Sequence, residues 1–351
     1  MFARRVPNLV RLLILGLALI LASGALAGCK PKPPPNRLIA FLLASDQSSR
    51  WMDSDEPAFQ KRVNQTCKGC SYLTLNASGD PDLQSEQFDQ ALSQGADVIV
   101  LNAVDSERAE DLIVAAGKVP VIAYDRFVAG ADYYVSYDAQ VTGELQAEAV
   151  LADAGGAAPS VLLIDGGRLD ANTRSIKDAR AATFGKKVQV LAELEPATWS
   201  AEEAAAWIKT QLGKHRPTTV DAIVAANDTQ AGAVVDVLTS MGVKPRQFPY
   251  ITGQDASLEA VRRIVRGEQA MTVYKPIITE ANQAADLAVA LVTSTAVTDS
   301  TDFEGVASFI FTPQSVTVNN LADTVVRDRL YSLEQICDAA TMPACERLGL
   351  R

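Results

Sequence analysis

The sequence predicts an α/β protein built from two lobes with doubly wound parallel sheets, and three observations support this fold. From Arg37 onward, short apolar runs alternate with longer stretches of helical periodicity, which is typical of βαβ units and parallel sheets. The apolar runs are continuous, so each strand is expected to be covered on both faces by the helices of a doubly wound sheet. About 315 residues follow position 36, which is more than one typical core and indicates two lobes.

Nine apolar segments are expected to form strands, and most are followed by turn residues and a helix. The first helix is expected to begin with Asp55 or Glu56 as its N-cap and Pro57 in its first turn. An eight-stranded βα barrel would give a similar local pattern. Chain length and the strand-like residues 133–137, which separate two series of βα units, favour two lobes. The expected strands are 38–43, 72–75, 98–101, 119–124, 161–164, 188–191, 222–226, 250–252 and 271–274.

Residues 1–28 have the features of a lipoprotein signal peptide. Three arginines precede an apolar run at 12–21, and small residues then lead to Leu26-Ala27-Gly28-Cys29. The run is too short for a permanent span, which needs roughly 20 apolar residues. Cleavage would leave Cys29 for lipidation, and two acyl chains suffice for stable anchoring. The alternative is an ordinary cleaved signal with Cys29 incidental.

The composition of the mature chain indicates an acidic protein outside the cytoplasm. The proline-rich segment 29–36 is expected to be an extended spacer that holds the folded part off the bilayer. Loss of residues 1–28 removes three arginines and no acidic residue, so the formal net charge changes from -10 to -13. This charge argues against nucleic acid as a partner, which needs a basic face. We expect a monomer anchored on the periplasmic or cell-surface side of a membrane.

The remaining cysteines fall into two close pairs, Cys67 with Cys70 and Cys337 with Cys345. In an oxidising compartment each pair is expected to form a local disulfide. The alternatives are a redox-active CxxC and a four-cysteine metal site. Both are disfavoured because Cys67 does not open a helix after a strand and no histidine lies nearby. We expect no metal and no cofactor.

Polar side chains gather just after the expected strands, which is where open α/β sheets bind ligands. Carboxylates accept hydrogen bonds from neighbouring hydroxyls, while arginine, lysine and asparagine donate to the same oxygens, and indole rings cover apolar C–H faces. This balance of charges favours a neutral polyol such as a sugar. The residues are Ser45, Asp46, Arg50, Trp51, Asn102, Asp125, Arg126, Asp165, Asn172, Trp199, Asn227, Asp228, Gln254, Asp255 and Lys275.

Several of these residues also have a simpler structural interpretation. Residues 227–229 could cap the helix that follows the 222–226 strand, residues 125–126 could form a surface ion pair, and Trp199 could pack in the core. Residues 53–56 read as a solvated helix start. Catalysis is disfavoured because the single histidine, His215, lies in a turn-like stretch, and the chain has neither a nucleophile elbow nor a phosphate-binding loop.

Five strings resemble those of periplasmic xylose-binding proteins, within the ribose/galactose type (type I) of ABC-transporter sugar-binding proteins. They are AYDR at 123–126, VTGELQA at 141–147, ANDTQAG at 226–232, GQDA at 253–256 and MTVYKP at 271–276. The resemblance runs from about Leu38 to Arg327. It implies two Rossmann-like lobes joined by three hinge crossings, near residues 136–137, 276 and 312–313.

The resemblance also implies a division of the chain and a set of sugar contacts. The N-terminal lobe would comprise residues 37–136 and 277–312, the C-terminal lobe 137–276 and 313–327, and a tail 328–351. One departure from the family pattern is Ala171 in Asp170-Ala171-Asn172, where the family has paired asparagines. The implied sugar contacts are Arg50, Asp125, Arg126, Asn172, Trp199, Asn227, Asp255 and Lys275, with Trp51 as a further candidate.

The function implied is a substrate-binding lipoprotein that closes on a monosaccharide, xylose or a similar sugar, and delivers it to an ABC permease. A sugar-sensing subunit for a chemoreceptor or a histidine kinase is the alternative. A regulator of the lactose-repressor type would need an N-terminal helix-turn-helix, where this chain has the lipobox. An enzyme such as a glycosidase is disfavoured, because the carboxylates lie among groups suited to holding a sugar.

Overall fold

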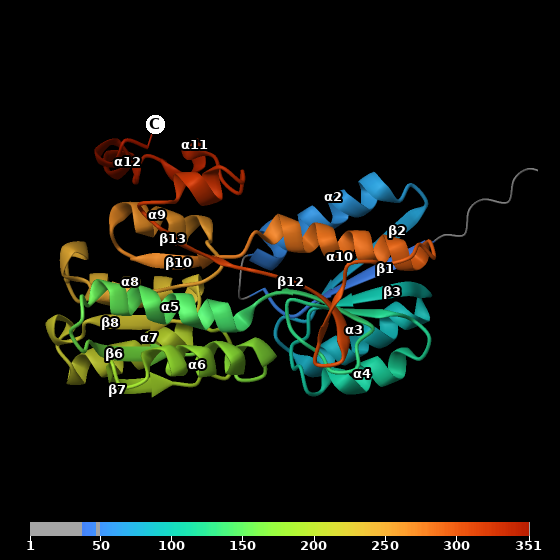
Figure 1. Cartoon of the computed structure of the whole chain (residues 1–351), viewed down its shortest axis with the longest axis horizontal. Coiled ribbons are helices and arrows are strands. Elements are labelled where there is room, and N and C mark those ends of the chain that lie inside the picture. The colour runs from blue at the N-terminus through green and yellow to red at the C-terminus, as the bar shows by residue number, and fades with distance from the viewer. Residues whose placement is uncertain (1–36, 47–49, 351) are drawn as a thin grey trace, which may run out of the picture. The chain divides into compact units, whose positions relative to one another are not determined.

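The computed structural model describes residues 37–46 and 50–350. A seven-stranded sheet and a four-stranded sheet form the centres of its two lobes (Figure 1). The expected signal peptide, Cys29 and the proline-rich spacer lie outside these residues. Among the helices within them, none is long and apolar enough to cross a bilayer.

The N-terminal lobe contains a seven-stranded sheet of order β11-β12-β5-β4-β3-β1-β2. Its strands pair in parallel except for the antiparallel pair β11 and β12. The strands are β1 (Arg37–Leu43), β2 (Cys70–Asn76), β3 (Ala96–Leu101), β4 (Val121–Tyr124), β5 (Tyr133–Tyr137), β11 (Thr301–Phe303) and β12 (Val306–Phe311).

Helices cover both faces of this sheet, because successive residues of its strands are apolar. Helices α2 (Glu56–Thr66) and α10 (Ile277–Val292) lie side by side on one face, above the strands in Figure 1. Helices α3 (Pro81–Ser93) and α4 (Ala109–Ala116) cover the other face. In β1, Phe41 packs with α2 and α10, and its neighbour Leu42 packs with α3 and α4.

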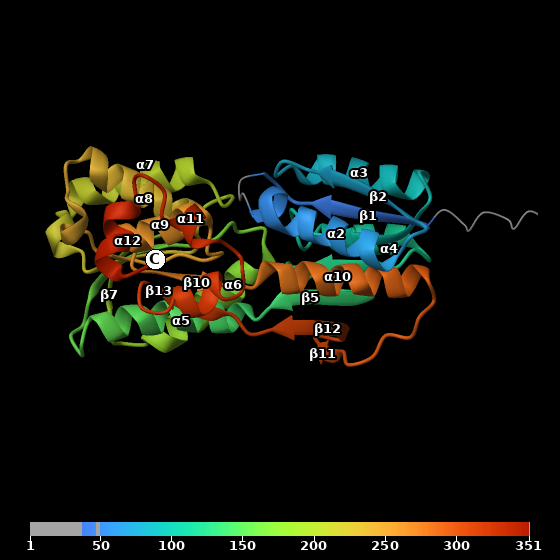
Figure 2. The same cartoon turned by 90° about the horizontal axis from the view of Figure 1, so that it is seen from above.

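The C-terminal lobe repeats this architecture with a four-stranded parallel sheet of order β7-β6-β8-β9 and a two-stranded ribbon, β10-β13. Helices α5 and α6 cover one face, and α7 and α8 the other (Figure 2). The strands are β6 (Ser160–Ile164), β7 (Gln189–Leu194), β8 (Ala222–Ala225), β9 (Tyr250–Ile251), β10 (Met271–Tyr274) and β13 (Gln314–Thr317). The helices are α5 (Ala139–Asp153), α6 (Ala171–Phe184), α7 (Ala201–Lys214), α8 (Asp228–Ser240) and α9 (Leu258–Arg266).

Short helical segments complete the described chain. A π-helical turn, η1 (Trp51–Asp55), precedes α2, and the 3-10 turns η2 (Pro217–Thr219) and η3 (Pro245–Gln247) precede β8 and β9. After β13 come the π-helical turn η4 (Ala322–Val326), α11 (Leu333–Ile336) and α12 (Met342–Leu348).

The chain passes between the lobes at three places. These are the end of β5, the link from β10 to α10, and the link from β12 to β13, as the resemblance implies. Two of the crossings are tied together, because the Tyr137 hydroxyl donates to the carbonyl oxygen of Pro276 at 2.9 Å. The two-lobe α/β fold is thus confirmed, and the barrel alternative is excluded by the two separate sheets.

Every expected strand occurs, but three strands were not predicted. The second strand of the C-terminal lobe, β7, ends at Leu194 rather than at residue 191, and β11, β12 and β13 fall after the regular βα alternation stops. Asp55 is the N-cap residue of α2 and Pro57 lies in the first turn, as expected. Asp55 makes no capping hydrogen bond and is fully buried rather than solvated.

Gly143 sets the distance between α5 and α6. A Cβ at this position would lie 2.2 Å from the carbonyl oxygen of Ile176 and 3.1 Å from the backbone nitrogen of Arg180. Gly143→Ala is therefore expected to lower the free energy of unfolding by about 1–3 kcal/mol, as overpacking does. Urea denaturation measures this loss. The matched control is Gly213→Ala in α7, where a Cβ meets nothing within 4 Å, and equal stabilities of the two variants would contradict the prediction.

Candidate functional site

A single cavity brings together all nine residues to which the resemblance assigned sugar contacts. The free space between these side chains is about 20 Å³, room for about one water molecule, so a ligand fits only if the surrounding side chains or lobes move apart. Ser45 and Gln254, also expected at strand ends, line the cavity, and so does Asp170. The other lining residues are Arg50, Trp51, Asp125, Arg126, Asn172, Trp199, Asn227, Asp255 and Lys275.

Arg50 is the most heavily bonded side chain in this cavity. All five N–H groups of its guanidinium donate to carboxylates. Nε and Nη2 donate to Asp55 at 3.1 and 2.8 Å, and Nη2 also donates to Glu280 at 3.0 Å. Nη1 donates to Asp125 at 3.1 Å and, from the other lobe, to Asp255 at 3.5 Å. The bond to Asp255 is the longest of the five and joins the two lobes.

Two carboxylates behind Arg50 were not predicted. Asp55 and Glu280 are fully buried, and Asp55 also accepts a hydrogen bond from the Tyr124 hydroxyl. Burial raises the pKa of both carboxyl groups, although Arg50 opposes the shift. Glu280 follows no strand, and Asp55 lies in a run of acidic residues that reads as solvated, so strand-end reasoning could not find them. Their burial next to Arg50 results from packing between distant segments, and no local sequence signal marks it.

Asp125 is held by cations from both lobes. Burial disfavours its ionised form, but Lys275, Arg50 and Arg126 together outweigh this and lower its pKa to about 2. Its carboxylate lies 3.4 Å from the Lys275 ammonium, across the lobes. Its backbone has φ 60°, a region that residues other than glycine rarely occupy except at turns and functional sites. Asp125 is therefore a fixed anion and not a surface ion-pair partner.

The C-terminal lobe contributes Asn227, Asp255 and Lys275. Asn227 is the N-cap of α8, because its Oδ1 accepts from the backbone N–H of Gln230 at 2.9 Å. The capping interpretation is therefore correct, and it leaves the amide NH2 available to a ligand. Asp255 has φ 96° and lies 3.2 Å from the Lys275 ammonium. Burial lowers the pKa of Lys275, but Asp125 and Asp255 outweigh it and raise the pKa above its ordinary value.

Two indole rings form apolar walls of the cavity. The guanidinium of Arg50 stacks 4.1 Å from the ring centre of the buried Trp51. The Trp199 indole N–H donates to Asp170 at 3.1 Å. Gly166 makes room for this ring, since a Cβ there would lie 2.4 Å from the indole. Trp199 is half-buried and lines the cavity rather than the core.

Asp170 organises the side of the cavity near Asn172. It is the N-cap of α6, accepting from the backbone N–H of Asn172 at 2.9 Å, and it pairs with Arg126 at 2.8 Å. The Asn172 amide donates across the lobes to the carbonyl oxygen of Asp125 at 2.8 Å. Ala171 contributes no side-chain polar group here, and its N–H donates to the Ser106 hydroxyl at 3.3 Å.

Four of the strand-end residues lie outside the cavity. Asp46 is exposed, and Asp228 is buried beside the cavity without lining it. The side chain of Asn102 accepts from the N–H of Ala44 at 3.1 Å and donates to the carbonyl of Tyr124 at 3.1 Å, so it joins neighbouring strands. Asp165 belongs to a separate group.

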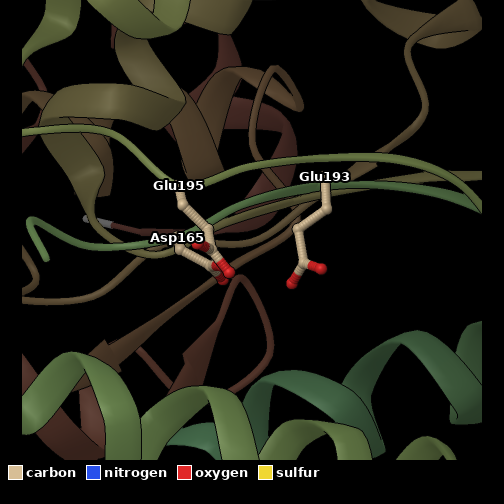
Figure 3. A group of neighbouring side chains, drawn as sticks. All are labelled: Asp165, Glu193 and Glu195. Carbon is tan, nitrogen blue, oxygen red and sulfur yellow. The ribbon is translucent and has the colours of Figure 1, made fainter.

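Asp165 lies with Glu193 and Glu195 at the ends of β6 and β7, with carboxylate oxygens within 4.8 Å of one another (Figure 3). Arg180 pairs with Asp165 at 2.6 Å and with Glu193 at 3.0 Å. The Lys177 ammonium pairs with all three carboxylates. The two cations therefore offset most of the negative charge of the three carboxylates.

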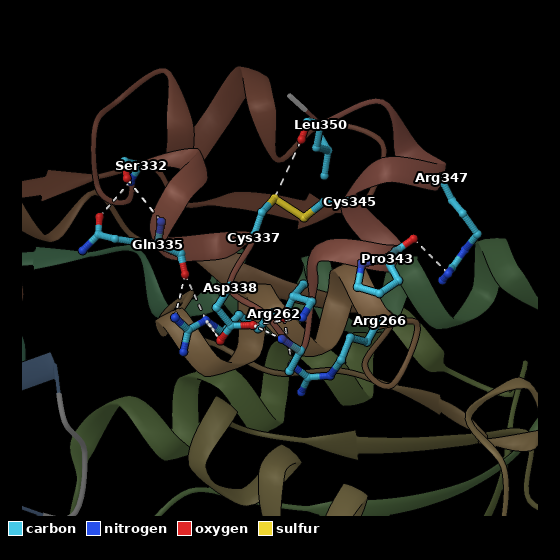
Figure 4. Close-up of a disulfide and its surroundings, with 12 residues drawn as sticks. Arg262, Arg266, Ser332, Gln335, Cys337, Asp338, Pro343, Cys345, Arg347 and Leu350 are labelled. Atoms are coloured by element: carbon cyan, nitrogen blue, oxygen red, sulfur yellow. Dashed lines mark hydrogen bonds and ion pairs between the residues drawn. A yellow bond between two sulfur atoms is a disulfide. The ribbon is translucent and has the colours of Figure 1, made fainter.

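A C-terminal tail packs on α9, the helix that follows the Asp255 loop (Figure 4). Arg262 donates from Nε and Nη2 to the carbonyl oxygen of Gln335 at 3.0 and 2.6 Å. The Cys337–Cys345 disulfide links α11 to α12, with an S–S distance of 2.05 Å. Its sulfurs share a hydrophobic cluster with Ala256. The second disulfide, Cys67–Cys70, closes the turn between α2 and β2.

The charges that line the cavity balance. Arg50, Arg126 and Lys275 face three lining carboxylates, those of Asp125, Asp170 and Asp255. Among the described residues that line it, no serine, cysteine or lysine is paired with a histidine base. The arrangement offers fixed donors and acceptors to a neutral ligand.

Comparisons with known proteins show the family of the chain. The model of the periplasmic binding protein domain matches residues 39–296. The chain belongs to the periplasmic binding protein family. It is 31% identical over 302 residues to the D-xylose-binding periplasmic protein of Haemophilus influenzae, covering 82% of this chain and 88% of that protein. It is 30% identical to the Escherichia coli protein of the same name, with the same coverage.

Solved structures of sugar-binding proteins share the fold. An ABC transporter solute binding protein from Clostridium phytofermentans with bound β-D-glucose superposes with a TM-score of 0.76 at 21% identity, covering 86% of this chain and 100% of that one. The relatives are periplasmic by name and are binding proteins, not enzymes. As a periplasmic binding protein, the chain has its cavity at the carboxyl ends of the strands of both lobes.

Proposed function

We propose that this protein is the substrate-binding component of an ABC sugar transporter and that its lobes close on one monosaccharide, xylose or a similar sugar. The observation that carries the proposal is the single cavity that collects the nine expected contact residues from both lobes. Two relatives that are at least 30% identical over most of the chain are named for binding D-xylose.

In the proposed complex, carboxylates and cations of both lobes share the hydroxyls of the sugar. Asp125 and Asp255 each accept from neighbouring hydroxyls, while Arg126 and Lys275 donate to the same oxygens. Trp199 covers a C–H face of the ring. Because these groups come from both lobes, a bound sugar stabilises the closed arrangement over the open one, and the hinge responds to the ligand.

Arg50 takes part in the proposed complex only by exchanging a partner. All five of its N–H groups are engaged, so a sugar oxygen must replace one carboxylate. The 3.5 Å contact to Asp255 is the longest and the one that spans the lobes. We infer that a sugar hydroxyl inserts between Arg50 and Asp255, donating to the carboxylate and accepting from the guanidinium.

The partners and the anchor of this component are also part of the proposal. Lipidation at Cys29 would tether a monomer to the membrane, and the closed lobes would dock on an ABC permease. Support for the tether comes from the lipobox at residues 26–29 and the proline-rich spacer that follows. Support for the permease comes from the family, in which a related solved structure is named as an ABC transporter solute binding protein.

Isothermal titration of the mature protein with a panel of pentoses and hexoses tests the proposal. We expect D-xylose or a closely similar sugar to bind with a Kd near micromolar, which corresponds to about -8 kcal/mol. Ala171 stands where the family has an asparagine, so its side chain offers no polar contact to a sugar. The order of affinities for the sugars of the panel is therefore the most informative result. Absence of binding by every monosaccharide at millimolar concentration would reject the proposal.

A further inference from the structure

Asp228 is a buried residue beside the cavity. Its backbone N–H and its side-chain carboxylate both bond to the loop that carries Asp255. Its backbone N–H donates to the carbonyl oxygen of Gln254 at 3.0 Å. Its Oδ2 accepts from the backbone N–H of Ser257 at 2.8 Å. One residue therefore bonds to the loop both before and after the two residues Asp255 and Ala256.

The two residues between these bonds have a backbone conformation that needs support. Asp255 has φ 96° and Ala256 has φ 51°, in the left-handed region that residues with a side chain rarely adopt. Such conformations persist only where the surrounding structure determines them. The Asp255 N–H donates to the carbonyl of Val273 at 2.9 Å and the Ala256 N–H to the hydroxyl of Thr272 at 3.1 Å.

The other oxygen of Asp228 is bonded just as firmly. Oδ1 accepts from the Gln269 amide nitrogen at 2.8 Å. The orientation of that amide is fixed, because its oxygen accepts from Arg263 at 3.0 Å and its nitrogen also donates to the carbonyl of Met271 at 3.0 Å. The carboxylate fills the space next to Gly253, where a Cβ would lie 2.1 Å from Oδ1.

This arrangement fits the ionised form of Asp228 and not the protonated form. Both oxygens face N–H donors, so a proton on either oxygen would point at another donor. Burial, with a further contribution from Asp255, raises the pKa of Asp228 to about 7 against the effect of Arg263. The charged and titratable groups around it are Arg263 from α9, Asp255 from the loop and Tyr331 from the tail.

We propose that Asp228 is a positioning residue that sets the backbone of Asp255 for the sugar, and that neutralising its carboxylate weakens sugar binding. This inference rests on the proposed function. Asp228 does not line the cavity, so it acts on the ligand through Asp255 and, as the residue after the N-cap, through Asn227.

Asp228→Asn tests this role with little change in side-chain shape. Asparagine offers one acceptor oxygen, so either Ser257 or Gln269 would face an NH2 group. We expect the Kd for D-xylose, measured by isothermal titration, to rise at least tenfold at pH 8. The matched control is Asp221→Asn in the same lobe, whose Oδ2 accepts from the N–H of Ser160 at 2.8 Å away from the cavity. The control is expected to leave the Kd unchanged.

The pH dependence separates positioning from a general loss of structure. The affinity of the wild type for D-xylose is expected to fall as the pH is lowered from 8 to 6, and that of Asp228→Asn to change much less. Gln269→Met removes a hydrogen bond that lowers the pKa of Asp228, so it should move the midpoint of this fall to higher pH. Gln269→Met should not alter the pKa of other buried carboxyl groups, such as that of Glu280.

The possible outcomes distinguish this inference from the proposed function. A wild type that binds no monosaccharide would reject the proposed function. A wild type that binds D-xylose while Asp228→Asn binds it equally well would overturn the role of Asp228. If Asp228→Asn fails to fold, the pH dependence of sugar affinity in the wild type and in Gln269→Met decides. An unchanged midpoint of this pH dependence in Gln269→Met would overturn the role of Asp228.

Discussion

Replacing Arg50 by methionine is expected to abolish sugar binding and to lower the free energy of unfolding by about 3–5 kcal/mol at pH 7. The substitution leaves Asp55 and Glu280 buried without their counter-charge, and an uncompensated buried charge has a cost of this size. Both carboxyls are fully buried, so water cannot replace the guanidinium. Asp125 keeps Lys275 as a partner, so the loss concerns mainly the two carboxyls behind the cavity.

The pH dependence of this loss identifies its cause. The folded protein already raises the pKa of Asp55 and Glu280 above the ordinary carboxyl range through burial, opposed by Arg50. Without Arg50 the pKa of each should rise further. A group with a raised carboxyl pKa binds more protons in the folded than in the unfolded state, so stability falls as pH rises through that range. The deficit of Arg50→Met should therefore grow between pH 5 and pH 8 in urea denaturation.

Arg62→Met is the matched control for Arg50→Met. Arg62 pairs with Asp286 at 2.7 Å between α2 and α10, but the two side chains are 38% and 39% exposed. Exposed ion pairs contribute at most about 1 kcal/mol. We expect Arg62→Met to remain close to the wild type in stability and sugar affinity. Equal losses in the two variants, or a deficit of Arg50→Met that does not change with pH, would contradict the role given to the buried carboxyls.

The cavity was predictable from the sequence where it depends on strand ends. The carboxyl ends of parallel strands converge at one edge of each sheet, so local patterns made Asp125 after β4 and Asn227 after β8 candidates for the site, and the resemblance then favoured them. Asn102 shows the limit of this rule. It also follows a strand, but both ends of its side chain bond to neighbouring backbone, and no local pattern distinguishes the two cases.

The groups behind the cavity depend on packing between distant segments. Glu280 is 230 positions from Arg50 and meets it only because α10 packs beside α2. The sequence predicted that Asp55 lies in solvent at the start of a helix. Its burial results from the packing of α10 beside α2, which local sequence does not show. The strands β11 to β13 lie where the chain crosses between lobes, after the alternation that predicts strands has ended. Long-range packing, and not local preference, decides these features.

Asp255→Asn is expected to weaken sugar binding about 100-fold or more while changing the stability of the sugar-free protein little. A hydrogen bond to a charged group contributes about 1.5–3 kcal/mol, and Asp255 is placed to accept from two hydroxyls. Asparagine tolerates the left-handed backbone at φ 96°, whereas alanine would add strain. Lys275 and Arg50 both keep Asp125 as a partner, at 3.4 and 3.1 Å, so the unfolding free energy should change by no more than about 1 kcal/mol.

Titration calorimetry and thermal unfolding together decide whether Asp255 acts on the ligand. The control is Asp132→Asn, an exposed carboxylate that accepts from the N–H of Val121 at 2.8 Å at the start of β4, far along the strand from its carboxyl end. It should bind the sugar as the wild type does. Retained affinity in Asp255→Asn would remove this carboxylate from the site, and a large loss of stability would mean that it holds the lobe together instead. A loss of affinity without a loss of stability would establish that the strained loop holds the Asp255 carboxylate in contact with the sugar.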